Sequence, residues 1–279
     1  EVNDSNLGVL SNYLSQTFGG TADQIRSAEK FLQAQETTPG FGRLLLALLN
    51  HPATESGIRQ AGAVYLKNFV RRRWPVIEGE ENCINDAERE EIKSVLLRMM
   101  LGSAANIQKL VSSTIYQISL NDFPTKWPTL IQELVDKCNT KDFAVINGVL
   151  KTAHAIFRRY RGAHATDEVI KEIILVIKNF GAPMVEMLSF SLNSLPTADP
   201  INAKQVELIF RCILSISKIF YSLNYIDLPE FFEDHIPQFF DQFFALLNYN
   251  VPPVLQELLL GDEDDPNAGL LTRVQAQIC

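Results

Sequence analysis

Residues 39–74 read PGFGRLLLALLNHPATESGIRQAGAVYLKNFVRRRW. Apolar residues recur at helical spacing in the first half of this stretch, at Phe41, Leu44, Leu45, Leu48 and Leu49. The same spacing recurs in the second half, at Ile58, Ala61, Tyr65, Leu66 and Phe69. Each series gives a helix one apolar stripe, and the intervening His51-Pro52 interrupts the pattern. The stretch therefore predicts two amphipathic helices joined by a short turn.

The same arrangement recurs along the chain. Residues 107–118 and 146–160 carry similar stripes, and no sustained alternation of apolar and polar residues indicates a strand. Breaks rich in Gly, Pro, Asn and Asp divide the sequence into about twelve helices, arranged as six pairs. The pairs are expected to start near residues 3, 39, 86, 126, 166 and 228. Most of these intervals are close to the roughly 40–47 residues of a HEAT or armadillo unit.

This period predicts an all-α fold, an α-solenoid of stacked antiparallel helix pairs (HEAT repeats) with about six repeats. One pair cannot bury its apolar face alone, whereas stacked pairs bury a continuous core and form a long concave surface that binds proteins. A compact helical bundle is the alternative, and the clear polar stripe on several second helices argues against it. Candidate N-caps follow several of the breaks, at Thr21, Thr38, Asp86 and Thr166.

Composition narrows the possible functions. The chain has 279 residues and a formal charge of −8, and an acidic chain without a broad basic stripe is a poor candidate for binding nucleic acid. We expect neither a signal peptide nor a membrane span, and four separated cysteines indicate reduced thiols in the cytosol or nucleus. The acidic runs at 78–81 and 262–265 are expected to be solvated loops or contacts with a basic partner. Because the chain starts without Met and stops within an apparent helix, we expect the N-terminal part of a longer protein.

Catalytic motifs are lacking. The four histidines are scattered without metal-ligand spacing, and neither a phosphate-cradling GxxxxGK[ST] loop nor a GxSxG nucleophile motif occurs. The many acidic residues fit solvated helix faces. We therefore expect a binding protein rather than an enzyme, without a metal or cofactor of its own.

A basic cluster ends the second helix of pair two. It consists of Lys67, Asn68, Arg71, Arg72 and Arg73, in which Lys67 and Arg71, like Asn68 and Arg72, lie one turn apart. Cations at a helix C-terminus stabilise it by about 0.3–1 kcal/mol, which accounts for the three arginines. Lys67 and Asn68 lie a turn earlier and are less well explained, so a partner-binding role stays open beside the structural one.

Two further features stand out. The loop at 122–128 holds two prolines and two aromatic residues, and we expect it to be a packed wedge that orients pair three against pair four. A polar row on the second helix of pair four lies opposite the apolar stripe, and it is either a solvated face or a partner contact. This row consists of Asn147, Lys151, His154 and Arg158.

Several of these stretches resemble segments of a known protein family. The segments 38–42 and 59–70, followed by Trp74, resemble the start of the importin-β (karyopherin-β) family, with Leu-Lys-Asn before basic residues and Trp as the most readable signature. The segment at 122–130 also matches the family. Within the family, the stretches 148–161 and 227–234 resemble the CAS-type exportins, which return importin-α to the cytoplasm. The matches extend over residues 7–240, which is most of the chain.

The resemblance implies a function. It implies a HEAT solenoid whose residues 1–137 correspond to the family's N-terminal, Ran-binding repeats, and whose residues 138–279 continue the same solenoid. Family members bind the small GTPase Ran in its GTP form through second helices of the first repeats. The candidates for that contact here are Lys67, Asn68, Arg71, Arg72, Gln24, Gln60, Asn106 and Lys109. The α-helical row of Asn147, Lys151, His154 and Arg158 is the candidate contact for cargo or Ran.

A CAS-type exportin implies cooperative binding of RanGTP and importin-α, with importin-α as cargo and the GTP carried by the GTPase. It also implies shuttling between nucleus and cytoplasm through the nuclear pore, with contacts to nucleoporins, but no binding to nucleic acid and no membrane insertion. Two alternatives remain. One is another karyopherin-β that exports a different cargo, and the other is a HEAT-repeat scaffold subunit of a larger complex.

Overall fold

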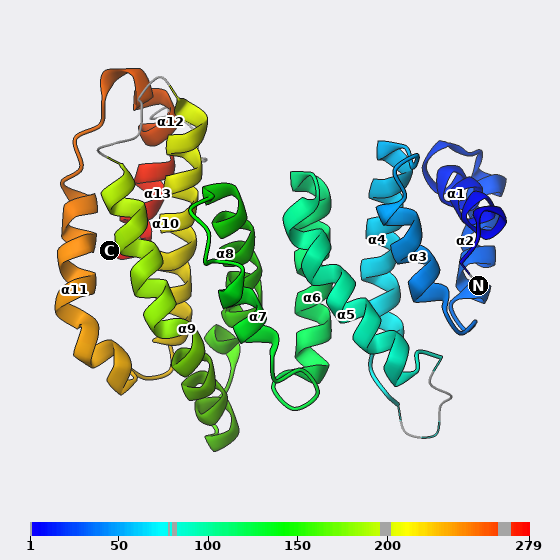
Figure 1. Ribbon diagram of the computed structural model, residues 1–279, viewed down its shortest axis with the longest axis horizontal. Coiled ribbons are helices and arrows are strands. Elements are labelled where there is room, and N and C mark those ends of the chain that lie inside the picture. The colour runs from blue at the N-terminus through cyan, green and yellow to red at the C-terminus, as the bar shows by residue number, and fades with distance from the viewer. Residues whose placement is uncertain (1, 78, 80–82, 196–201, 262–268) are drawn as a thin grey trace. The chain divides into compact units, whose positions relative to one another are not determined.

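The computed structural model describes residues 2–77, 79, 83–195, 202–261 and 269–279. Both acidic runs considered above, at 78–81 and 262–265, involve residues outside the described part. All regular elements in the described part are helices, and they form two compact units, Glu1–Trp127 and Pro128–Cys279 (Figure 1). Each unit is described by itself.

The first unit consists of three consecutive helix pairs. Their bounds are α1 (Asp4–Gly19), α2 (Ala22–Gln35), α3 (Phe41–Asn50), α4 (Ser56–Arg73), α5 (Asp86–Gly102) and α6 (Ala105–Asp122). The second helices α4 and α6 pack against each other, and so do the first helices α3 and α5, while α1 contacts both α3 and α4. The core lies between the pairs, where Leu45, Leu66, Ile92 and Ile115 are fully buried.

The second unit repeats this plan. Its helices are α7 (Leu130–Asp136), α8 (Phe143–Phe157), α9 (Asp167–Ser194), α10 (Ala203–Leu223), α11 (Glu230–Leu247), α12 (Gln256–Leu260) and α13 (Leu270–Ile278), with 3-10 turns η1 (Arg158–Gly162) and η2 (Pro253–Leu255). The first helices α7, α9 and α11 stack in that order, and the second helices α8, α10 and α13 stack beside them. The short elements η2 and α12 lie in the connection of the last pair.

The all-α solenoid of about six helix pairs is confirmed. The first helices of the described pairs begin at residues 4, 41, 86, 130, 167 and 230, each within four residues of the expected start. Prediction of these starts succeeds because Gly, Pro and capping residues are local signals. The expected division between residues 137 and 138 stays a prediction.

Helix α9 is long and apolar enough to cross a membrane by length and composition. Half of its most apolar window is buried within the structure. Its neighbours are α7, α10 and α11, which cover one face of the helix, whereas Ile170 and Ile174 on another face are exposed.

The helix caps are partly as expected. Thr21 and Thr166 cap α2 and α9 with their side chains, whereas Asn85, rather than its neighbour Asp86, caps α5. Thr38 does not cap α3, because the chain turns through Gly40, whose φ of 85° lies in the left-handed region. A side chain from another pair caps this helix instead.

That side chain belongs to Glu88, at the start of α5. Its carboxylate accepts hydrogen bonds from the backbone N–H of Gly40 at 3.0 Å and of Arg43 at 3.3 Å. A Cβ on Gly42 would lie 3.0 Å from Glu88 Oε1 and 2.8 Å from the Ile92 side chain. In the Pro-Gly-Phe-Gly segment, the left-handed turn at Gly40 and the missing side chain at Gly42 thus allow the Glu88 side chain to approach the start of α3.

Replacement of Glu88 by alanine is expected to destabilise the chain by about 1–2 kcal/mol, because an N-cap acceptor is lost and two N–H groups lose their partner. Urea unfolding followed by circular dichroism measures this change. Ser94→Ala, at an exposed position of the same helix, is the matched control. An effect of Glu88→Ala no larger than that of the control would show that water replaces the carboxylate at no cost.

Candidate protein-binding face

The first candidate face lies on α4. Its residues Gln60, Asn68 and Arg72 line a groove of about 600 Å³ whose other walls come from α1 and α2. Arg71 is exposed and Lys67 is half-buried, and neither forms an ion pair with any residue of the described part. Two cations one turn apart on α4 are thus available to a partner.

Arg72 is less available to a partner than Lys67 and Arg71, because it already has an acidic partner within the chain. The carboxylate of Glu36, of which only 1% is exposed, pairs with Arg72 and Arg73 and accepts a hydrogen bond from the Tyr65 hydroxyl at 2.8 Å. Burial alone would raise the pKa of Glu36, but hydrogen bonds from Arg72 and Tyr65 outweigh burial and hold that pKa below its ordinary value. The end of α4 is therefore tied to the end of α2 by a buried acid.

The other Ran-binding candidates of this unit are dispersed. Asn106 on α6 donates a hydrogen bond to the side chain of Gln60 on α4 at 3.0 Å, so these two residues bridge pairs two and three. Gln24 uses its side chain in the cap of α2, where it accepts from the Thr21 N–H at 2.8 Å. Lys109 is exposed on α6. The structure thus brings Gln60 and Asn106 together, and Lys109 lies one turn after Asn106 on α6.

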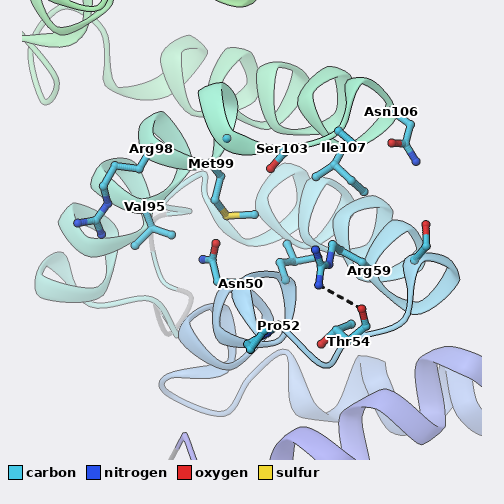
Figure 2. A pocket seen from close by; sticks show the side chains of 14 residues that line it. Asn50, Pro52, Thr54, Arg59, Val95, Arg98, Met99, Ser103, Asn106 and Ile107 are labelled. Atoms are coloured by element: carbon cyan, nitrogen blue, oxygen red, sulfur yellow. Dashed lines mark hydrogen bonds between the residues drawn. The ribbon is translucent and has the colours of Figure 1, made fainter. Parts of the chain in front are cut away.

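Asn106 also borders a hollow of about 760 Å³ between pairs two and three, shown in Figure 2. In this hollow Arg59 donates hydrogen bonds to the carbonyls of His51 at 2.9 Å and Thr54 at 3.1 Å. The guanidinium thereby closes the turn between α3 and α4. The only other cation on the wall is Arg98, which is exposed on α5. The hollow is an open crevice between repeats rather than a site with convergent chemistry.

The loop after α6 is anchored within the first unit. Asp122 accepts a hydrogen bond from the Trp74 indole at 3.0 Å and pairs with Lys93 Nζ at 2.9 Å. Lys93 also donates to the Lys126 carbonyl at 2.9 Å and lies over the Trp127 ring. The loop therefore ties pair three to pair two. The expectation that it orients pair three against pair four stays a prediction.

The second candidate face lies on α8. The structure buries Asn147, of which only 5% is exposed, so it does not lie on an open face. The reason is the packing of α10 over α8. Lys151 and Arg158 are exposed, and His154 is half-buried. Within the described part of the chain, Asn147 Oδ1 and His154 Nε2 are buried without a hydrogen-bond partner.

Cations surround this face. Burial, and then the charges of Arg161, Lys218 and Arg158, lower the pKa of His154 to about 4, so the ring is neutral at physiological pH. Burial, and then the charge of Arg211, lower the pKa of Lys151. Arg211, Lys218 and Arg161 are not among the residues predicted from the sequence. A count of charges helix by helix would have found them, because α8, η1 and α10 together contain a single acidic residue, Glu207.

Comparisons with known proteins agree with this architecture. The family model for the importin-beta N-terminal domain matches residues 28–102, and the Cse1 model matches residues 156–279. Exportin-2 of Danio rerio is 41% identical over 280 aligned residues, which cover 100% of this chain and 28% of that protein. The chain thus spans a little over a quarter of the length of this relative.

Solved structures show the same fold. The exportin Cse1 in its cargo-free, cytoplasmic state superposes with a TM-score of 0.86 and 31% identity, covering 98% of this chain and 28% of that one. Importin beta superposes with a TM-score of 0.58 and 15% identity, covering 97% of this chain and 33% of that one, which supports the fold alone.

Proposed function

This chain belongs to the importin-β family, among its Cse1-type exportins, and we propose that it forms part of a receptor that binds Ran in its GTP form together with importin-α. The receptor returns importin-α from the nucleus to the cytoplasm and so shuttles through the nuclear pore. The nucleotide enters the complex on the GTPase, and the receptor itself needs no cofactor and no catalytic residue. Because the chain spans only about a quarter of its relatives, much of the partner interface lies outside it.

The observation that carries the proposal is the pair of cations on α4. Lys67 and Arg71 lie within the region matched by the importin-beta N-terminal domain, point from one helix at one-turn spacing, and form no ion pair in the described part. Asn68, between them in sequence, lines the neighbouring groove. Arg72 contributes less than its position in the motif suggests, because Glu36 already neutralises it. We therefore rank Lys67, Asn68 and Arg71 above Arg72 as contacts for Ran.

Cooperativity has a physical basis in the fold. Repeats that contact only their neighbours let a solenoid change curvature along its length. If Ran and importin-α both prefer one curvature, each raises the affinity of the receptor for the other by the same factor. Equal affinity for importin-α with and without Ran would contradict this mechanism.

A separate feature supports contacts with nucleoporins. An apolar groove of about 540 Å³ runs between α9 and the start of α11, with Ile170, Ile174 and Leu228 exposed on its walls. Exposed apolar grooves of this kind accept apolar side chains of protein partners. This groove belongs to the second unit, whereas the cations on α4 belong to the first.

The proposal is tested by substituting Lys67 and Arg71 with alanine in the full-length receptor. Binding to Ran loaded with GTP is expected to weaken at least about tenfold, because a charged partner group loses its counterion at the interface. Pull-down with Ran loaded with GTP or GDP, with importin-α added or omitted, measures the effect.

The matched control is the double variant Arg98→Ala and Lys171→Ala, which removes the same charge from exposed positions on first helices. Equal binding of GTP-loaded and GDP-loaded Ran to the unmodified receptor would overturn the proposed function. Equal affinity of the two double variants would overturn only the assignment of the site.

A further inference from the structure

Charge is segregated between the two rows of helices in the second unit. The second-row elements α8, η1, α10 and α13 together contain eight Lys and Arg residues and a single acidic residue, Glu207. The first-row helices α7, α9 and α11 contain ten Asp and Glu residues and only two lysines. Among the described helices of the second unit, the second row is thus strongly basic, although the formal charge of the chain is −8.

Two of these cations have an acidic partner within the second unit, and three others have none among the described residues. Arg211 pairs with Glu207, and Arg159 pairs with Glu172. Within the described residues, Lys151, Lys218 and Arg273 form no ion pair. The positive charges of these three side chains are therefore left without a counterion from the described part of the chain.

Arg161 is held in place without losing its charge. Its guanidinium donates hydrogen bonds to Ser222 Oγ at 2.9 Å and to the Lys218 carbonyl at 2.7 Å, and it stacks over the Tyr221 ring at 4.7 Å. All of these partners are neutral groups, so they fix the orientation of the guanidinium and leave its charge to act on a ligand.

The cations form one surface. Helix α10 packs between α8 and α13, and Figure 1 shows the three side by side in the second unit. Lys151 on α8 is influenced by Arg211 on α10, and Lys218 on α10 is influenced by Arg273 on α13 and by Arg161. After burial, these neighbouring charges are the next causes that lower the pKa of both lysines. Positive charge therefore extends across three helices.

Such a surface carries an electrostatic cost, because like charges repel in the folded chain and a bound anion relieves the repulsion. We propose that this basic surface, formed by Lys151, Arg158, Arg161, Lys218 and Arg273 around His154, binds an acidic segment of a partner protein. The proposal deepens the assignment of the α8 row as a contact for cargo or Ran, and in that respect it rests on the proposed function.

The chemistry favours an acidic peptide over a nucleic acid. The carboxylates of a short peptide segment can lie entirely within the basic surface. A nucleic acid carries phosphates along its whole length, so it extends beyond the basic surface toward the acidic first-row helices of the same unit. The exposed ring of Tyr221 also offers an apolar contact to a peptide. The guanidinium of Arg161, whose orientation is fixed, offers a bidentate contact to a carboxylate of that peptide.

The test uses a fluorescein-labelled peptide of Asp, Glu, Ser and Gly, and the same peptide with Asn and Gln in place of the acids. Fluorescence anisotropy is expected to show that this chain binds only the acidic peptide and that added salt weakens the binding. Replacing Lys151, Lys218 and Arg273 together by glutamine is expected to weaken it about tenfold, since each exposed ion pair contributes modestly.

The control replaces Lys171, Lys178 and Arg98 by glutamine, which changes the net charge equally on first helices. Because Lys218 is half-buried, the double variant of Lys151 and Arg273 serves as a second test with exposed positions only. The proposal is overturned if the acidic peptide does not bind, if the control weakens it as much, or if single-stranded RNA binds more tightly. Ran binding is tested separately, with variants of α4. If this chain does not bind the acidic peptide but the receptor still binds GTP-loaded Ran, the basic-surface proposal is wrong and the proposed function is unaffected.

Discussion

Replacement of Asp122 by alanine is expected to lower the free energy of unfolding by about 3–5 kcal/mol, the usual cost of removing one partner of a buried ion pair. Asp122 and Lys93 are 2% and 4% exposed, so the ammonium group left behind cannot be fully solvated without opening the packed loop. The indole N–H of Trp74 loses its acceptor in the same change. Chemical unfolding followed by near-ultraviolet circular dichroism reports on the packing of the aromatic residues, the buried Trp74 and Trp127 among them.

Two further variants make the Asp122 prediction specific. Asp241→Ala removes a carboxylate from an exposed position of α11 and should leave stability nearly unchanged. Adding Lys93→Met to Asp122→Ala should recover part of the loss, because it removes a buried ammonium whose remaining charged partner is the exposed Glu90, at 2.8 Å, while the apolar stem remains. If the double variant is as unstable as the sum of the single variants, the two side chains are not coupled and the explanation is wrong.

The second large effect concerns Glu36. Replacing it by alanine is expected to cost about 2–3 kcal/mol at neutral pH, because hydrogen bonds to a charged group are lost from Tyr65, Arg72 and Arg73. The cost stays below that of Asp122→Ala, because Arg72 and Arg73 are 40% and 37% exposed and can turn to water. Glu29→Ala, at an exposed position of the same helix, is the control.

The Glu36 effect also depends on pH in a defined direction. Since the folded pKa of Glu36 lies below its ordinary value, its contribution is complete above the ordinary carboxyl pKa and is lost as pH falls through the folded value. The unfolding free energies of the unmodified chain and the variant should therefore converge in strongly acidic solution. A constant difference between neutral and strongly acidic pH would show that the carboxylate charge contributes nothing.

The sequence was sufficient for the fold because its signals are local. The stripe from Phe41 to Leu49 and the break at Pro52 define a helix without reference to any other part of the chain. The Leu-Lys-Asn signature likewise places its candidate residues on one helix, α4, because Lys67 and Asn68 are neighbours in sequence.

The long-range partners could not be predicted in the same way. Glu36 reaches Arg72 across 36 positions, and Glu88 reaches Gly40 across 48. Periodicity assigns both acids to solvated faces, since it carries no information on which repeat lies above another. The same limit explains Asn147. The sequence pattern places it in a polar row opposite the apolar stripe, but the structure buries it because α10 packs over α8.

The cap that Glu88 provides for α3 has a consequence for the order in which the chain can form. The cap of α3 can form only after Glu88 has left the ribosome. The hydrogen bond from the Trp74 indole can form only later, after Asp122 has left it. The second helix pair of the nascent protein therefore stays incomplete until the third pair is made, and this is the interval in which its exposed apolar surface favours binding by chaperones.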